Sequence, residues 1–163
     1  MRLYEYEGKE IFRKRGIPVP DGRMVETPEQ AREAFAELQP AVVKSQVLIG
    51  GRGKAGGIKF PADPEDARRC AAELLSMSIK GYRVRRLLVE KKISIAQELY
   101  LGITIDRSAS APVLLACGRG GMDIEEIARA YPAEIIRHAI DPLIGIAGYA
   151  AMDISRRMGL RKH

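Results

Sequence analysis

The amino-acid sequence predicts a protein of the α/β class, in its α+β form, with short helices and strands mixed along the chain. Two observations carry this prediction. Thr27-Pro28 and Asp63-Pro64 each place a capping side chain before a proline at the first helical position, and an amphipathic segment follows each pair. In addition, five glycines fall within residues 50–57, between two segments of strand-like composition.

The first half of the chain is expected to begin with a helix from Tyr4 to Arg15. Gly16 ends this helix, and the prolines in residues 17–22 make a stiff linker. The next expected elements are a strand at 23–26, a helix from 28 to about 38, a strand at 41–47 and a short strand at 58–60. The glycine-rich segment joins the last two strands, so it lies inside a predicted hairpin.

The second half continues the mixture of helices and strands. A helix with apolar residues at helical spacing is expected after Asp63, and residues 86–90 form a buried strand with a polar end. The remaining expected elements are a β-rich segment at 95–105, a central strand at 112–117, a helix at 123–130 and a helical segment near 149–158.

The amino-acid composition limits the classes of protein to which this chain can belong. The 163 residues are 46% hydrophobic, which is ample for a packed core, and no apolar run has the length of about 20 residues that a membrane helix needs. No signal peptide precedes the first helix, so the expected location is cytoplasmic. Cys70 and Cys117 lack metal-ligand spacing and are expected to be reduced thiols. The charge of +6 arises from basic residues mixed with acidic ones, so nucleic acid is not the expected partner.

The glycine-rich segment matches the dinucleotide-binding fingerprint G-x-G-x-x-G from Gly51 to Gly56 as a string. That fingerprint delivers a pyrophosphate to the start of a helix, and here Pro61 follows too soon for a helix to begin. The P-loop pattern also fails, because Leu48 stands where it needs glycine and Ala55 where it needs Ser or Thr. The kinase pattern fails as well, since the chain has no His-Arg-Asp or Asp-Phe-Gly segment.

A glycine-rich turn between antiparallel strands lets backbone N–H groups approach phosphate oxygens. Arg52 and Lys54 add positive charge within the turn, and Lys44 lies on the strand before it. These features predict a loop that covers the phosphates of a nucleoside triphosphate. The alternative is a basic hairpin tip that binds no ligand.

Several segments together resemble one known family. They are Leu3 to Lys9, Gly16 to Pro20, Val42 to Gly57, Leu88 to Glu90, Gln97 to Gly102, Asp106 to Ser108, Gly120 to Glu125 and Asp141 to Leu143. In these segments the chain is similar to the amino-terminal part of the β subunit of succinyl-CoA synthetase, a family of acid–CoA ligases with the ATP-grasp fold. The resemblance covers nearly the whole chain, and the segment from Val42 to Gly57 is its most specific part.

The resemblance implies a nucleotide site, with ATP or GTP as the ligand. The residues that it implies are Lys44, Gly51, Arg52, Gly53, Glu90, Ile93 and Glu98. Lys44 is expected to contact the phosphates beneath the flexible glycine loop, and Glu90 and Ile93 to lie at the hinge that holds the base. Glu98 is expected to face the nucleotide from the next strand. From the residues alone, Lys44 could equally be a solvated strand residue, and Glu90 or Glu98 a surface charge.

Two departures from the family pattern bear on the chemistry. The family holds Mg²⁺ with an asparagine and an aspartate, and this chain contains no asparagine, so the sequence predicts no metal ligands and no catalytic residues within it. Cys117-Gly118-Arg119 stands where the family has Ser-Thr-Glu, which leaves the role of that loop open. His138 is expected to be a structural or surface histidine, because the phosphate-accepting histidine of the family belongs to the α subunit.

These inferences predict an ATP-grasp type of fold with a small complete lobe at 22–92. Residues 1–21 and 93–163 form part of a second lobe. The implied function is the nucleotide-binding portion of an acid–CoA ligase β subunit, which acts with an α subunit that carries the phosphohistidine and the CoA site. Succinate is the expected acid, with malate or citrate as alternatives, and the chain alone is expected to bind nucleotide weakly and to lack ligase turnover. A stand-alone nucleotide-binding or assembly module is the other hypothesis.

Overall fold

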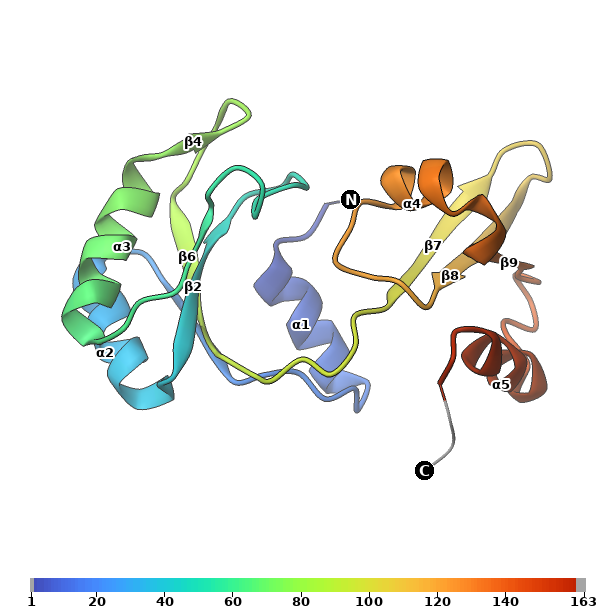
Figure 1. The fold of residues 1–163 in the computed structure, drawn as a ribbon, viewed down its shortest axis with the longest axis horizontal. Helices are drawn as coiled ribbons and strands as arrows, with labels where there is room; N and C mark the ends of the chain where they lie inside the picture. Colours follow the sequence, from blue (N-terminus) through green and yellow to red (C-terminus); the bar gives the residue numbers. More distant parts are fainter. Residues whose placement is uncertain (1, 161–163) are drawn as a thin grey trace. The chain divides into compact units, whose positions relative to one another are not determined.

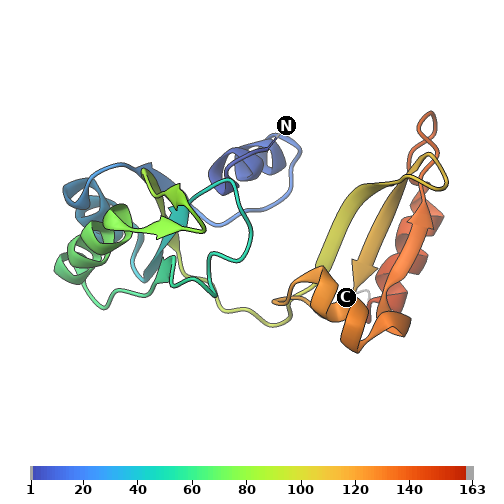
Figure 2. The same cartoon turned by 90° about the horizontal axis from the view of Figure 1, so that it is seen from above.

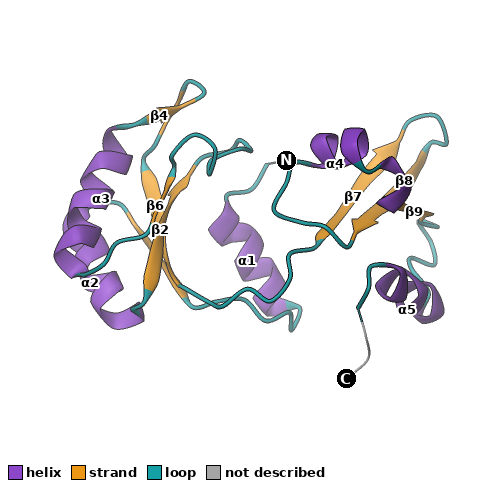
Figure 3. Ribbon diagram, in the orientation of Figure 1, coloured by secondary structure: helices purple, strands orange, loops and turns teal. Residues whose placement is uncertain are grey.

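The computed structural model describes residues 2–160. The chain divides into two compact units, Met1–Ser94 and Ile95–His163. Short helices and antiparallel sheets make up both units, which confirms the mixed α and β class (Figure 3). The division of this chain into one lobe at 22–92 and part of a second at 1–21 with 93–163 stays a prediction.

The first unit is built on a four-stranded antiparallel sheet in the order β1-β6-β2-β3 (Figure 1). Its strands are β1 (Gly22–Val25), β6 (Arg86–Lys91), β2 (Ala41–Gln46) and β3 (Ile58–Lys59). β2 and β3 pair directly, with Lys44 opposite Ile58. The glycine-rich residues between them therefore form the end of a hairpin, as the sequence predicts.

Helices cover both faces of this sheet. α2 (Pro28–Leu38) and α3 (Pro64–Ser76) lie on one face, and α1 (Glu5–Lys14) lies on the other (Figures 1 and 2). The face toward α2 and α3 is apolar, because alternate strand residues such as Val43 and Val89 join Phe35 and Leu74 in the buried core. Lys44, Gln46 and Glu90, which alternate with these apolar residues, consequently point toward α1.

The predicted helix starts are confirmed by their capping contacts. Thr27 accepts a hydrogen bond from the Gln30 N–H at 3.2 Å, and Asp63 accepts one from the Asp66 N–H at 2.7 Å. The Gln30 side chain reaches back to the N–H of Glu26 at 2.9 Å, one residue before the position in a standard capping box. Both helices thus begin at the residues that local chemistry indicates.

The structure contains one hairpin that the sequence did not predict. β4 (Ser78–Ile79) and β5 (Tyr82–Arg83) pair across the two-residue turn of Lys80 and Gly81, both of which have positive φ. This is the backbone conformation of a type I′ turn, which matches the twist of the two strands that it connects. The hairpin carries Tyr82 and Arg83 beside the start of β6.

The second unit is a three-stranded antiparallel sheet in the order β7-β8-β9. Its elements are β7 (Tyr100–Asp106), β8 (Ala111–Cys117), α4 (Ile124–Ala130), a 3₁₀ turn at Pro132–Glu134, β9 (Ile136–Ala139) and α5 (Gly148–Arg157). β7 begins five residues later than the predicted segment at 95–105, and β9 was not predicted. Leu114 and Ala116 pack with Ile154 of α5, while Ile103 on the same face of the sheet is exposed.

The two cysteines are far apart in the sequence and lie in different elements. Cys70 lies in α3 and Cys117 in β8, and both are free thiols. In the described part of the chain, no helix is long and apolar enough to cross a membrane.

The apolar core between the sheet and α2 gives a stability prediction. Phe35 is 2% exposed in this core, whereas Phe60 is 67% exposed and contacts the Lys92 ammonium, 5.7 Å from its ring centre. Phe35→Ala should lower the free energy of unfolding by about 3–5 kcal/mol, because it removes buried area and leaves a cavity. The matched change Phe60→Ala should cost less than about 1 kcal/mol. Urea unfolding followed by circular dichroism measures both, and equal losses would contradict this placement of the core.

Candidate functional site

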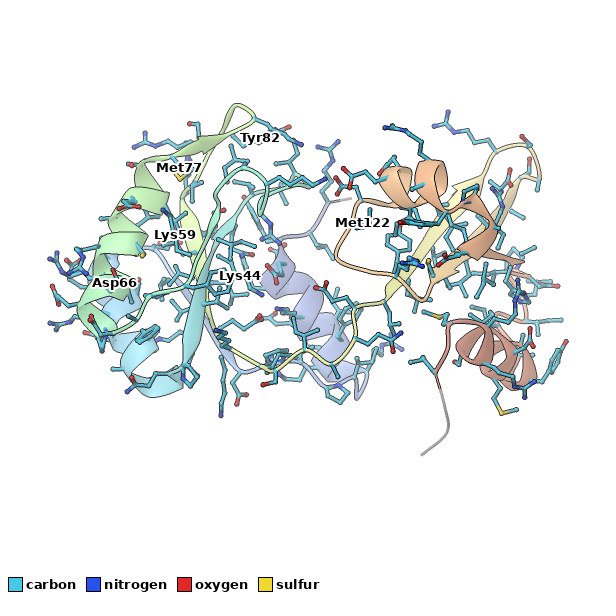
Figure 4. The ribbon with its side chains drawn as sticks, in the orientation of Figure 1. Lys44, Lys59, Asp66, Met77, Tyr82 and Met122 are labelled. Atoms are coloured by element: carbon cyan, nitrogen blue, oxygen red, sulfur yellow. The ribbon has the colours of Figure 1, made fainter. Side chains whose placement is uncertain are left out.

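The face of the sheet that points toward α1 carries charged side chains beside apolar ones such as Val42 and Leu88. Lys44 on β2 and Glu90 on β6 both project from this face and form an ion pair. Glu90 is almost fully buried, with 5% of its side chain exposed, and Lys44 has 19% of its side chain exposed. Figure 4 shows Lys44 on the α1 side of the sheet and Lys59 on the opposite side, toward α3. Neither Lys44 nor Glu90 is a freely solvated surface charge.

α1 and the glycine loop complete this cluster. Glu5 accepts hydrogen bonds from Lys9 at 2.8 Å and from Lys44 at 3.4 Å, and it forms an ion pair with Arg52 at 2.8 Å. Lys9 also pairs with Glu90. The ion cluster, defined as Glu5, Lys9, Lys44, Arg52 and Glu90, therefore holds three cations and two carboxylates, which leaves one positive charge in excess. A half-buried site with excess positive charge favours an anionic ligand.

The ion cluster sets the protonation of its members. Burial alone would raise the pKa of Glu5, but the hydrogen bond from Lys9 and the charges of Lys44, Lys9 and Arg52 outweigh burial and lower this pKa from 4.5 to about 2. For Lys44, burial would lower the pKa, and the hydrogen bond to Glu90 with the charges of Glu5 and Glu90 raises it instead. Glu5 is thus ionised and Lys44 protonated at neutral pH.

The glycine loop is fastened at its base to the end of β2. The Ser45 N–H and the Ser45 hydroxyl both donate to the Gly57 carbonyl, at 2.8 and 2.9 Å. Arg52 folds back across the loop and donates to the Ser45 carbonyl at 2.9 Å. A side chain at Gly57 would collide with Ser45 and would come within 2.7 Å of Ile79, so only glycine fits at this base.

The tip of the loop presents backbone donors without partners. Gly51 has a φ of +80°, which favours glycine, and the chain turns there. Among the residues that the structure describes, the N–H groups of Gly51, Arg52 and Gly53 donate to no acceptor. Successive unpaired N–H groups in a tight turn form an anion-binding concavity, which is the feature expected of a phosphate-covering loop.

The structure brings some of the predicted site residues together and leaves others apart. Lys44, Arg52 and Glu90 meet in the ion cluster, and Gly51 and Gly53 flank Arg52 on the loop.

Ile93 lies two residues beyond β6 and is 55% exposed. Glu98 belongs to the second unit, where it is exposed and has no ion pair within the described residues. The structure therefore gives neither residue a contact that would indicate a role with the nucleotide, and those roles remain predictions.

Sequence reasoning assigned no role to Glu5 and Lys9. Their spacing of four residues places them on one face of α1, which was the available signal. That spacing alone describes an ordinary surface ion pair, and only the packing of α1 on the sheet brings the pair to Lys44 and Glu90.

The segment at Cys117-Gly118-Arg119 makes local contacts within the second unit. The Arg119 guanidinium donates to Glu134 at 2.6 Å and lies 4.4 Å from the centre of the Tyr131 ring. His138 is half-buried on β9, opposite Leu114 of β8. The described residues contain no group of three or more His, Cys, Asp or Glu side chains that could hold a metal ion.

Comparisons with known proteins identify the family. The model of the ATP-grasp domain family matches residues 2–163. The chain belongs to the ATP-grasp family.

Curated relatives of this ATP-grasp chain are β subunits of succinate–CoA ligase (ADP-forming). The protein from Desulfurococcus amylolyticus is 49% identical over 163 residues, which are 99% of this chain and 43% of the relative. The protein from Methanothermobacter thermautotrophicus is 49% identical over 161 residues, which are 98% of this chain and 44% of the relative. The chain is thus homologous to the ATP-grasp portion of these β subunits, and it spans less than half of their length.

Solved structures share the fold at lower sequence identity. An acetyl-coenzyme A synthetase from Ca. Korarchaeum cryptofilum, in complex with coenzyme A and Ca-AMPCP, matches with a TM-score of 0.73 and 21% identity. The match covers 94% of this chain and 65% of that one. An ATP citrate lyase from Methanothrix soehngenii matches with a TM-score of 0.64 and 22% identity, over 89% of this chain and 36% of that one. These likenesses establish the ATP-grasp fold.

The lowered pKa of Glu5 predicts how stability depends on pH. A carboxyl group with a lower pKa in the folded state stabilises the fold above its unfolded pKa, and this contribution disappears as the pH falls from about 4.5 to about 2. Each tenfold change in proton affinity is worth about 1.4 kcal/mol, so the contribution is about 3 kcal/mol.

The variant Glu5→Gln should therefore be less stable than the parent at pH 6 and similar to it near pH 2. Glu10→Gln is the matched control, because Glu10 is exposed on α1 and has no ion pair within the described residues. Chemical unfolding at a series of pH values measures the difference. A Glu5→Gln difference that stays constant across the series would contradict the ion cluster.

Proposed function

We propose that this chain binds the triphosphate of ATP between the ion cluster and the glycine loop. One juxtaposition carries the proposal: Lys44 and Arg52, two half-buried cations that share the Glu5 carboxylate, lie beside the unpaired N–H groups of residues 51–53. Ammonium and guanidinium groups together with backbone N–H groups are the donors that phosphate oxygens require. A triphosphate also neutralises the excess positive charge of the cluster.

The arrangement assigns separate tasks to the two carboxylates. Glu90 is buried and holds Lys44 from within the sheet, so it positions the ammonium group. Glu5 approaches Lys44 and Arg52 from α1 and occupies the position of an anionic ligand. Phosphate oxygens would replace Glu5 as the partner of both cations, while Glu90 keeps Lys44 in place. Lys44 and Arg52 would then stabilise negative charge on the phosphates during phosphoryl transfer.

ATP is the proposed nucleotide, with GTP as the alternative, because the similar β subunits are named as ADP-forming. We assign Ile93 to the base and Glu98 to the ribose, whose hydroxyls can donate to a carboxylate, which follows the family resemblance. Mg²⁺ would accompany the nucleotide in the complete protein, and no residue of this chain is proposed as its ligand.

We further propose that the chain acts as the nucleotide-binding part of a succinate–CoA ligase β subunit, in the cytoplasm. The identity of 49% to β subunits of that name supports succinate over malate or citrate. An α subunit with the phosphohistidine and the CoA site would be its partner. A structure of the similar acetyl-coenzyme A synthetase from Ca. Korarchaeum cryptofilum contains coenzyme A and a phosphorylated phosphohistidine segment. This is consistent with a partner subunit that carries the phosphohistidine and the CoA site.

The nucleotide proposal is tested by isothermal titration of the chain with ATP and excess Mg²⁺. Lys44→Met should weaken ATP binding at least tenfold, because it removes a charged donor to phosphate. Lys59→Met is the matched control: Lys59 lies on the neighbouring strand, faces α3 and pairs with Glu73, so ATP affinity should change by less than about twofold. Equal affinities of Lys44→Met and the parent chain would contradict the proposal.

A further inference from the structure

A pocket of about 350 Å³ lies in the first unit, outside the ion cluster. Its walls are the start of β6, the β4–β5 hairpin, the end of β2 and the residue before α1. Three arginines dominate the lining, and we call it the arginine pocket after Arg83, Arg85 and Arg86. Tyr4 and Tyr82 supply two aromatic walls, and Tyr82 is visible on the hairpin in Figure 4.

The arginine pocket has excess positive charge. Within the described residues, the guanidinium groups of Arg83 and Arg85 have no ion pair and no hydrogen bond. Glu26 is the carboxylate in the lining, and it pairs with Arg86 at 3.1 Å. Three guanidinium groups against one carboxylate leave two positive charges without a partner.

One of the three guanidinium groups is held in a fixed position. Arg86 donates to Glu26 through Nε and to the Tyr6 hydroxyl through Nη1, each at 3.1 Å, and it lies 5.8 Å from the centre of the Tyr4 ring. The Tyr4 and Tyr6 rings are stacked in turn. A guanidinium group that is already ordered loses less conformational entropy when a ligand binds.

The chemistry of the lining indicates the class of ligand. Guanidinium groups bind carboxylate and phosphate groups through paired hydrogen bonds. The volume lies at the low end of the range of about 300–1,000 Å³ for small-molecule sites, so the ligand is small.

The arginine pocket lies at one end of the proposed nucleotide site. On the α1 face of the sheet, Gln46 and its partner Arg86 follow Lys44 and its partner Leu88 along the strands, about 7 Å farther from Glu90. The hairpin that carries Arg83 also contacts the glycine loop, because Lys80 donates to the Gly50 carbonyl at 3.3 Å. A triphosphate that runs from Glu90 past Lys44 therefore ends near this pocket.

We propose that the arginine pocket binds a small anion with phosphate or carboxylate groups, separate from the nucleotide and next to its terminal phosphate. Its place beside the terminal phosphate rests on the proposed function, whereas anion binding by the pocket does not.

Isothermal titration of the 163-residue chain with inorganic phosphate, and separately with succinate, tests this proposal. The double variant Arg83→Gln/Arg85→Gln should bind that anion with at least about tenfold lower affinity, because both free guanidinium groups are lost. Arg68→Gln with Arg69→Gln on α3 removes the same charge outside the pocket and should change the affinity by less than about twofold. Saturable binding in the phosphate titration or in the succinate titration shows which of the two anionic groups the arginine pocket binds.

Three results would overturn the proposal. The first is that neither anion binds saturably, and the second is that the two double variants lose the same affinity. The third is a tenfold loss in Lys44→Met without a loss in the Arg83/Arg85 variant, which would place the anion in the nucleotide site. If Lys44→Met left ATP binding unchanged, only the proposed nucleotide site would be refuted. The arginine pocket is tested separately, by the binding of phosphate or succinate.

Discussion

The buried carboxylate of Glu90 is the constraint on which the rest of the site depends. It is buried near the end of β6 on the sheet face toward α1, where an unpaired charge would be very costly, and it is matched by Lys44 from β2 and Lys9 from α1. The same pairs fix the Lys44 ammonium and attach α1 to the sheet. Glu90 thus links the packing of a helix to the position of a proposed phosphate ligand.

The two faces of one sheet perform different tasks. The face toward α2 and α3 supplies an apolar core that needs no ligand, whereas the face toward α1 gathers charge that is only partly neutralised. The positive excess continues along β2 and β6, from the ion cluster to the arginine pocket. A rigid apolar layer therefore supports a row of cations, and this is the arrangement that a polyanionic ligand with a second anion beside it would require.

Local chemistry was enough to predict most elements of the fold. The caps at Thr27 and Asp63 and the β-rich composition of residues 41–47 are local features of the sequence, and the structure confirms the two helices and the strand that they predict. The β4–β5 hairpin escaped prediction because two strands of two residues carry no periodicity. Among the site residues, Lys44 and Arg52 could be found through the glycine loop beside them. Glu5 could not, because its role arises from the docking of α1, which depends on tertiary contacts.

The most direct test of the phosphate site is a crystal structure of the chain with a non-hydrolysable ATP analogue. Our account predicts phosphate oxygens within hydrogen-bonding distance of Lys44 Nζ and of the N–H groups of residues 51–53. It also predicts that Glu5 leaves Lys44 and Arg52 while Glu90 stays paired with Lys44. A nucleotide bound elsewhere, with Glu5 still paired to both cations, would contradict it.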